Sequence, residues 1–200
     1  MSDIKFIYFD VGGVILNTDR AYRNIGEISG KSVDEINGIF EKYAALEEKD
    51  VKEILEDYKR ELHISFETYE DFVKIHTAAF TPIKETHTLM RKLIKSFPLG
   101  LFSNTEPLIL ETCIKQGSIP NISFRTILAS CYVGYRKPQK EIYLIGQERA
   151  GFDAKNILLI DDKKENVDAA KVLGWQAIQF NARGPKASSD FIGNYLNERI

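Results

Sequence analysis

Five short apolar runs, separated by helical segments, constrain the fold of this 200-residue chain most strongly. Glycine, proline or acidic residues punctuate the chain around these runs, which is typical of buried strands. Strands that alternate with helices of about ten to fifteen residues form a mostly parallel sheet covered by helices on both faces. The sequence therefore predicts an α/β fold. The predicted strands are residues 5–9, 97–102, 126–129, 156–160 and 176–180.

Residues 17–83 interrupt this alternation, because they carry helix signals and no convincing strand. Ser32 and Glu35 form a capping-box pattern ahead of one helix, Asp50 can cap a second helix, and we expect a third over 66–80. The pattern therefore predicts a small all-helical cap domain inserted after the first strand of an α/β core. The predicted boundaries are 1–16 and 84–200 for the core and 17–83 for the cap.

Composition and charge make several classes of function implausible. The chain has 27 basic and 29 acidic residues and a formal charge of −2, so we expect neither a nucleic-acid nor a membrane partner. No stretch approaches the roughly 18 apolar residues of a membrane span, and the first residues do not resemble a signal peptide. Two cysteines, Cys113 and Cys131, are too few for a disulfide framework, which favours a reducing, cytoplasmic location.

Polar residues follow four of the predicted strands directly or within a short loop. In doubly wound sheets, ligands bind beyond the carboxyl ends of the strands, so these residues are the first candidates for function. Together they supply three carboxylates, one lysine and one hydroxyl, a set that suits a divalent cation and an anionic substrate. The candidates are Asp10, Ser103, Asn104, Lys137, Asp161 and Asp162.

Four motifs in this order resemble those of the haloacid dehalogenase (HAD) superfamily, and the resemblance covers essentially the whole chain. They are FDVGGV at 9–14, FSNT at 102–105, RKP at 136–138 and IDDKKEN at 160–166. The helical insertion resembles the C1-type cap of subfamily IA, and the nearest similarity is to the branch that contains sugar-phosphate (glucose-1-phosphate) phosphatases. The resemblance implies a Rossmann-like core, a hydrolase and Mg²⁺ as the cofactor.

The resemblance also implies catalytic roles for four residues. Asp10 would be the nucleophile that attacks phosphorus and forms an aspartyl-phosphate, which water then hydrolyses. The Ser103 hydroxyl and the Asn104 backbone N–H would hold phosphate oxygens. Lys137 would neutralise the phosphate and orient Asp10.

The resemblance further implies a magnesium site. Asp10, the carbonyl oxygen of Gly12, and Asp162 would be ligands of Mg²⁺, and Asp161 would bind it through water or orient the other ligands. This set agrees with the preference of Mg²⁺ for a few carboxylates together with water and phosphate oxygens.

Gly12 departs from the family pattern, because the family's phosphatases usually carry an aspartate there as general acid and base. Glycine cannot donate a proton, and loss of such a group costs about 10² to 10⁴ in rate. Three hypotheses follow: a Mg²⁺-dependent phosphatase for a small phosphorylated metabolite, possibly a sugar phosphate; a metal-independent dehalogenase; or a non-catalytic binding protein. We favour the phosphatase, because without a cation the carboxylates of Asp10, Asp161 and Asp162 would repel each other.

Overall fold

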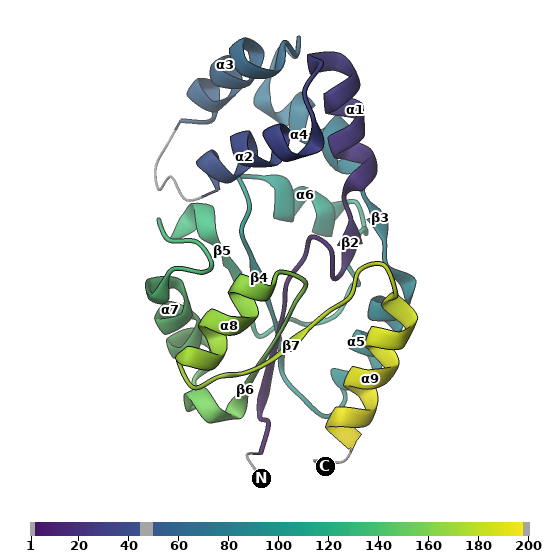
Figure 1. The fold of residues 1–200 in the computed structure, drawn as a ribbon, viewed down its shortest axis with the longest axis vertical. Coiled ribbons are helices and arrows are strands. Elements are labelled where there is room, and N and C mark those ends of the chain that lie inside the picture. Colours follow the sequence, from purple (N-terminus) through teal and green to yellow (C-terminus); the bar gives the residue numbers. More distant parts are fainter. Residues whose placement is uncertain (1–2, 45–49, 198–200) are drawn as a thin grey trace.

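Strand β1 lies at the centre of a five-stranded parallel sheet with the order β5-β4-β1-β6-β7 (Figure 1). The structure is a computed structural model that describes residues 3–44 and 50–197. All five strands lie within a residue or two of their predicted positions, so the predicted α/β fold class is confirmed. Their bounds are β1 Phe6–Phe9, β4 Leu99–Ser103, β5 Thr126–Ala129, β6 Ile157–Asp161 and β7 Gln176–Gln179.

Alternate side chains of β1 enter the two hydrophobic cores on either face of the sheet. Phe6 and Tyr8 belong to one core, and Ile7 and Phe9 belong to the other, as the two-residue period of a strand requires. Trp175 stacks on the ring of Tyr8 with 5.6 Å between ring centroids. Helices α7 and α8 pack on the face of Tyr8, and α5 and α9 pack on the other face. Their bounds are α5 Lys84–Leu93, α7 Lys140–Ala150, α8 Lys164–Val172 and α9 Pro185–Asn197.

Four helices form a separate layer beyond the carboxyl end of the sheet, at the top of Figure 1. A two-stranded antiparallel pair, β2 (Leu16–Asn17) and β3 (Thr81–Pro82), lies where the chain enters and leaves this layer. We expected the range 17–83 to be purely helical, but it also contains β3 and the last residue of β2. Strands of two residues are too short to show an alternating pattern. The helices are α1 Asp19–Ser29, α2 Val33–Tyr43, α3 Val51–Leu62 and α4 Tyr69–Ala78.

The structure confirms two of the predicted helix starts in this layer and moves a third. The capping box of Ser32 at the start of α2 is confirmed, and the Asp50 side chain caps α3 by accepting from a backbone N–H. Helix α4 begins three residues later than predicted, because Thr68 caps it. Helix α1 was not predicted, and the Thr18 side chain at its start makes no capping hydrogen bond. The domain boundaries stay a prediction, and their ranges include residues 1–2, 45–49 and 198–200, which lie outside the described residues.

Aromatic side chains fill the interior of the helical layer. Phe40, Tyr58, Phe72 and His76 lie with neighbouring ring centroids 5.1–5.3 Å apart. Burial lowers the pKa of His76 to about 4, so its imidazole is neutral at pH 7 and packs as an aromatic ring. The apolar interior of the cap layer is continuous with the hydrophobic core on the Ile7 and Phe9 face of the sheet.

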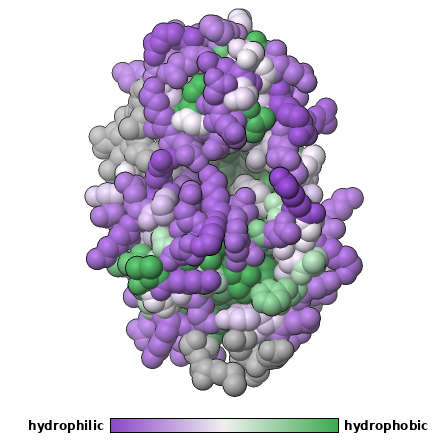
Figure 2. Space-filling view, in the orientation of Figure 1, coloured by the Kyte–Doolittle hydropathy of each residue, from purple (hydrophilic) through white to green (hydrophobic). Residues whose placement is uncertain are grey.

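The remaining elements connect the sheet strands. Helix α6 (Ile109–Lys115) and the short 3₁₀ helices η1 (Ser130–Tyr132) and η2 (Ala154–Asn156) lie between them. The face shown in Figure 2 is mainly hydrophilic, with scattered apolar residues. Among the described residues, no helix has both the length and the apolar composition needed to cross a membrane.

Gly100 is expected to be essential for packing in the centre of the sheet. A Cβ atom there would lie 2.7 Å from the Tyr8 ring and 2.9 Å from the Phe6 ring. We expect Gly100→Ala to lower the free energy of unfolding by about 1 to 3 kcal/mol, measured by urea denaturation, because overpacking displaces buried rings. Gly38→Ala is the matched control. Gly38 is an exposed position within α2 where a Cβ atom meets nothing within 4 Å, so alanine should stabilise the protein by about 0.5 to 1 kcal/mol. Equal midpoints for both variants would contradict this account.

Candidate active site

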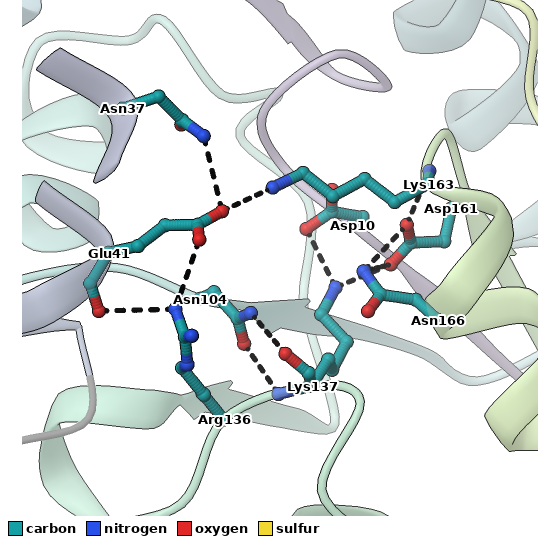
Figure 3. Close-up of polar contacts among 9 residues, drawn as sticks. All are labelled: Asp10, Asn37, Glu41, Asn104, Arg136, Lys137, Asp161, Lys163 and Asn166. Atoms are coloured by element: carbon teal, nitrogen blue, oxygen red, sulfur yellow. Dashed lines mark hydrogen bonds and ion pairs between the residues drawn. The ribbon is translucent and has the colours of Figure 1, made fainter. Parts of the chain in front are cut away.

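The carboxyl ends of β1, β4 and β6 bring the predicted site residues together around the ammonium group of Lys137 (Figure 3). Lys137 Nζ lies 2.9 Å from Asp10 Oδ1 and 2.6 Å from Asp161 Oδ2. It also donates a hydrogen bond of 2.7 Å to the carbonyl oxygen of Phe102. Asp10 follows β1 and Asp161 ends β6, so a buried lysine from the loop before α7 joins three strands of the sheet.

Asp162 completes a group of three carboxylates. Asp10, Asp161 and Asp162 each have an oxygen within 4.8 Å of one from each of the others. Burial, together with the charges of Asp161 and Asp162, outweighs Lys137 and raises the pKa of Asp10 to about 7. Burial and the charge of Asp161 likewise raise the pKa of Asp162. Lys137 pairs with Asp10 and Asp161, whereas Asp162 forms no ion pair among the described residues, so the cluster is a suitable environment for a cation.

The donor set fits Mg²⁺, which prefers carboxylate and carbonyl oxygens. Within the described part of the chain, Asp162 Oδ1 is buried and has no hydrogen-bond partner. Gly13 allows this carboxylate to approach the loop after β1, since a Cβ on Gly13, whose φ is +75°, would collide with Asp162. The arrangement thus leaves a buried carboxylate oxygen available for a metal ion.

Asp161 differs from Asp162 in being held on several sides. Its oxygens accept hydrogen bonds from Lys137 Nζ, from the backbone N–H of Lys163 at 2.9 Å and from Asn166 Nδ2 at 3.0 and 3.1 Å. Asp161 is fully buried, whereas Asp162 lines the cavity described below. Both oxygens of Asp161 are thus engaged by protein donors, and its role toward a metal ion stays a prediction. Asn166 belongs to the fourth motif, but its contact with Asp161 was not predicted.

Asn104 of the second motif makes structural contacts that the sequence did not reveal. The Asn104 side chain donates to the carbonyl oxygen of Lys137 and accepts from its backbone N–H, both at 2.8 Å. Asn104 thereby fixes the loop that carries Lys137. Ser103 is buried and lines a small cavity of about 90 Å³ next to the site. The phosphate contacts of Ser103 and of the Asn104 N–H stay predictions.

A cavity of about 440 Å³ separates the helical layer from the carboxyl end of the sheet. Its floor is formed by residues of the core, and its roof is formed by residues of α1 and α2. Positive charge is also present, because Lys163 and Arg183 line the cavity. The floor contains Asp10, Gly12, Asn104, Lys137 and Asp162, and the roof contains Asp19, Tyr22, Asn37, Phe40 and Glu41.

Glu41 of α2 links the cap layer to the core at the rim of this cavity (Figure 3). Its carboxylate lies 2.6 Å from Lys163 Nζ and 3.2 Å from Arg136 Nη1, and Asn37 Nδ2 donates to it at 3.2 Å. Partial burial raises the pKa of Glu41, but Lys163 and Arg136 outweigh this effect and hold it below its usual value. Sequence analysis missed Glu41, because an acid on a surface helix looks like any other solvated charge.

Comparison with known proteins agrees with this geometry. The family profile of haloacid dehalogenase-like hydrolases matches residues 7–180, and the chain belongs to this family. The chain is 23% identical over 193 residues to Phosphatase MT3486 of Mycobacterium tuberculosis. The alignment covers 90% of this chain and 89% of that protein. It is 24% identical over 188 residues to the Phosphorylated carbohydrates phosphatase of Thermotoga maritima, with 88% and 84% covered.

A solved structure shares the fold. The HAD family enzyme BT-2542 of Bacteroides thetaiotaomicron, crystallised with magnesium and inorganic phosphate, superposes with a TM-score of 0.73 at 22% identity. The match covers 90% of this chain and 95% of that one. The family profile confirms the resemblance to the HAD superfamily, whereas the subfamily and the sugar-phosphate branch stay predictions.

Replacement of Lys137 tests the charge balance of the site. We expect Lys137→Met to lower the free energy of unfolding by about 3 to 5 kcal/mol at pH 8 without added metal, because two buried carboxylates lose their counter-charge. The loss should shrink as the pH falls, since protonation removes the carboxylate charges. Urea denaturation measures both effects.

The control for this experiment is Lys164→Met. Lys164 is exposed and pairs with Asp168 on the helix surface, so its removal should change the free energy of unfolding by less than about 0.5 kcal/mol. Equal losses in the two lysine variants would show that Lys137 is not a buried counter-charge.

Proposed function

We propose that this protein is a Mg²⁺-dependent phosphomonoesterase that acts on a small phosphorylated metabolite. One observation carries the proposal. A buried Asp10, held by Lys137, lies beside two further carboxylates at the floor of a cavity that the helical cap closes. A nucleophilic carboxylate, a fixed ammonium group and a cation-binding group are the parts that phosphoryl transfer through a covalent intermediate requires.

In this proposal an Asp10 oxygen attacks the phosphorus atom, the bond to the leaving oxygen breaks, and an aspartyl-phosphate forms. Lys137 holds Asp10 in place and balances negative charge that spreads over the phosphate oxygens in the transition state. Water then attacks the same phosphorus atom and releases phosphate and free Asp10. Ser103 and the Asn104 N–H hold phosphate oxygens during both steps.

Asp10, Asp162 and the carbonyl oxygen of Gly12 would hold Mg²⁺, with Asp161 orienting the site. The bound ion would neutralise carboxylate charge and let an anionic substrate approach an anionic nucleophile. Support comes from the Asp162 oxygen without a hydrogen-bond partner, and from BT-2542, which binds magnesium and phosphate in the same fold.

The size of the cavity favours a small substrate, and its lining favours a hydroxylated one. About 440 Å³ accommodates a sugar phosphate, and Asn17, Asn37 and Asp19 offer hydrogen-bonding groups beyond the phosphate site. The two relatives described above, a phosphatase and a phosphatase of phosphorylated carbohydrates, support the same class. A cytoplasmic location stays a prediction that rests on the two cysteines.

Phosphate release from a panel of sugar phosphates, nucleotides and an aryl phosphate tests this function. We expect turnover with Mg²⁺ that stops on chelation and returns when Mg²⁺ is restored. Asp10→Asn should reduce turnover by several orders of magnitude, because the amide is a poor nucleophile. Asp168→Asn changes the same group at an exposed helix position and should retain full activity.

Two other results would reject the proposal. Halide release from a 2-haloacid in the presence of a chelator would identify a dehalogenase instead. Saturable binding of a phosphorylated compound, with turnover equal to that of Asp10→Asn, would identify a binding protein.

A further inference from the structure

Gly12 has no side chain that could donate a proton to the leaving group. A Cβ atom built on Gly12 meets nothing within 4 Å, so the position has room for a side chain that the protein does not have. An alkoxide or sugar-oxygen leaving group departs slowly without a proton, and general acid catalysis supplies about 10² to 10⁴ in rate. The proton donor should therefore be sought on the walls of the space that Gly12 faces.

Glu106 lies on those walls. It lines the large cavity together with Asp10, Gly12 and Lys137, and it lines the small cavity of about 90 Å³ together with Gly12 and Ser103. Glu106 and Gly12 therefore border the same two cavities. Glu106 comes three residues after the last residue of β4, so the same sheet edge that positions Ser103 and Asn104 also positions Glu106.

A cap residue orients the carboxyl group of Glu106. The hydroxyl of Tyr58 from α3 donates a hydrogen bond of 3.0 Å to Glu106 Oε1. Tyr58 is fully buried in the aromatic interior of the cap, between Phe40, Tyr43 and Phe72. Glu106 is half-buried and faces the cavity. Its carboxyl group is thus held from the cap side and presented to the space above the nucleophile.

The surroundings of Glu106 suit a proton donor at neutral pH. Burial raises the pKa of Glu106 to about 7, although the hydrogen bonds from its own backbone and from Tyr58 lower it. Across the large cavity, Glu106 faces the charged groups of Asp10, Lys137, Asp162 and Lys163. The groups packed around it on its other sides are neutral at pH 7, because burial raises the pKa values of the tyrosines and the thiol and lowers that of the histidine. These groups are Tyr22, Tyr58, Tyr69, Cys131 and His76.

The other carboxylates around the large cavity are less suitable donors. Glu41 is paired with Lys163 and Arg136, and its lowered pKa keeps it ionised. Asp19 and Asp34 are exposed on the cap helices. The remaining carboxylates belong to the group around Lys137 that we assign to the nucleophile and the metal ion.

We propose that Glu106 is the general acid and base that replaces the side chain absent at Gly12. This inference rests on the proposed phosphatase function. In the first step an Asp10 oxygen bonds to phosphorus, the bond to the leaving oxygen breaks, and its electron pair takes the proton of Glu106. In the second step a water oxygen bonds to phosphorus, the bond to Asp10 breaks, and the ionised Glu106 takes the proton of that water. Glu106 ends protonated, Asp10 ends as a carboxylate, and phosphate leaves.

Glu106→Gln tests this role with two substrates of the same size class. For an alkyl or sugar phosphate with a poor leaving group, we expect kcat to fall by about 10² to 10⁴. For an aryl phosphate such as 4-nitrophenyl phosphate, aspartyl-phosphate formation should be much less affected, because that leaving group needs no proton. The burst of nitrophenol measures this first step separately from the hydrolysis of the intermediate.

The pH dependence of kcat/KM is a second test, because a purely structural role of Glu106 would leave it unchanged. In the native protein, kcat/KM for the poor leaving group should fall as the pH rises through about 7, where Glu106 loses its proton. Glu106→Gln should abolish this decline. Tyr58→Phe removes a hydrogen bond that favours the carboxylate form, so the pKa of Glu106 should rise and the decline should move to higher pH.

Restoration of an acid at Gly12 separates lost chemistry from lost folding. We expect the double variant Gly12→Asp with Glu106→Gln to have a kcat at least tenfold higher than Glu106→Gln alone, because the open space can accept a carboxyl group. A misfolded variant would not recover in this way. Glu148→Gln, at an exposed position of α7, is the matched control and should behave as the native protein.

Each result distinguishes this inference from the function on which it rests. If Asp10→Asn is inactive while Glu106→Gln keeps kcat for the sugar phosphate within threefold and keeps the decline above pH 7, the phosphatase stands and Glu106 is not its acid. If the native protein releases phosphate from no substrate in the panel, both proposals are rejected. Loss in Glu106→Gln with recovery by Gly12→Asp supports both.

Discussion

The buried ammonium group of Lys137 is the interaction on which the rest of the site depends. It contacts Asp10 after β1, the carbonyl oxygen of Phe102 in β4 and Asp161 at the end of β6. A buried charge is costly unless it is paired, and here Lys137 pairs with both Asp10 and Asp161 across the sheet edge. The parallel sheet places these strand ends side by side, and Lys137 makes their proximity energetically acceptable. The carboxylates still outnumber the lysine, which explains why the site suits a divalent cation.

The cap completes the site and does more than cover it. Glu41 reaches from α2 to Arg136 and Lys163, and Tyr58 reaches from α3 to Glu106. Arg136 and Lys163 belong to the third and fourth motifs, and Glu106 directly follows the second. Movement of the cap would therefore alter the charges at the rim and the orientation of the carboxyl group that we assign as the proton donor. Substrate access and catalysis would be linked through the same contacts.

Gly12 illustrates how one missing side chain can be interpreted from geometry. In sequence it looks like a defect in a phosphatase motif. In the structure it borders open space that Glu106 shares, so an acid from another strand end can reach the same region. A site built from several loops at one sheet edge can supply a proton from more than one of them. This is a reason for testing activity before concluding that the protein only binds its ligand.

The sequence by itself determined the fold class, the order of the motifs and the identity of the residues around Lys137. Apolar runs of strand length, each followed by polar residues, are local signals, and parallel strands bring their carboxyl ends to one edge. It determined less of the cap, because β2 and β3 are only two residues long and show no alternating pattern. Only the tertiary structure showed the long-range contacts of Asn104, Glu41 and Glu106 and the contact of Asn166 with Asp161. Apart from the contact between Asn166 and Asp161, these contacts join residues from 33 to 122 positions apart along the chain, so no local pattern distinguishes them from ordinary polar residues.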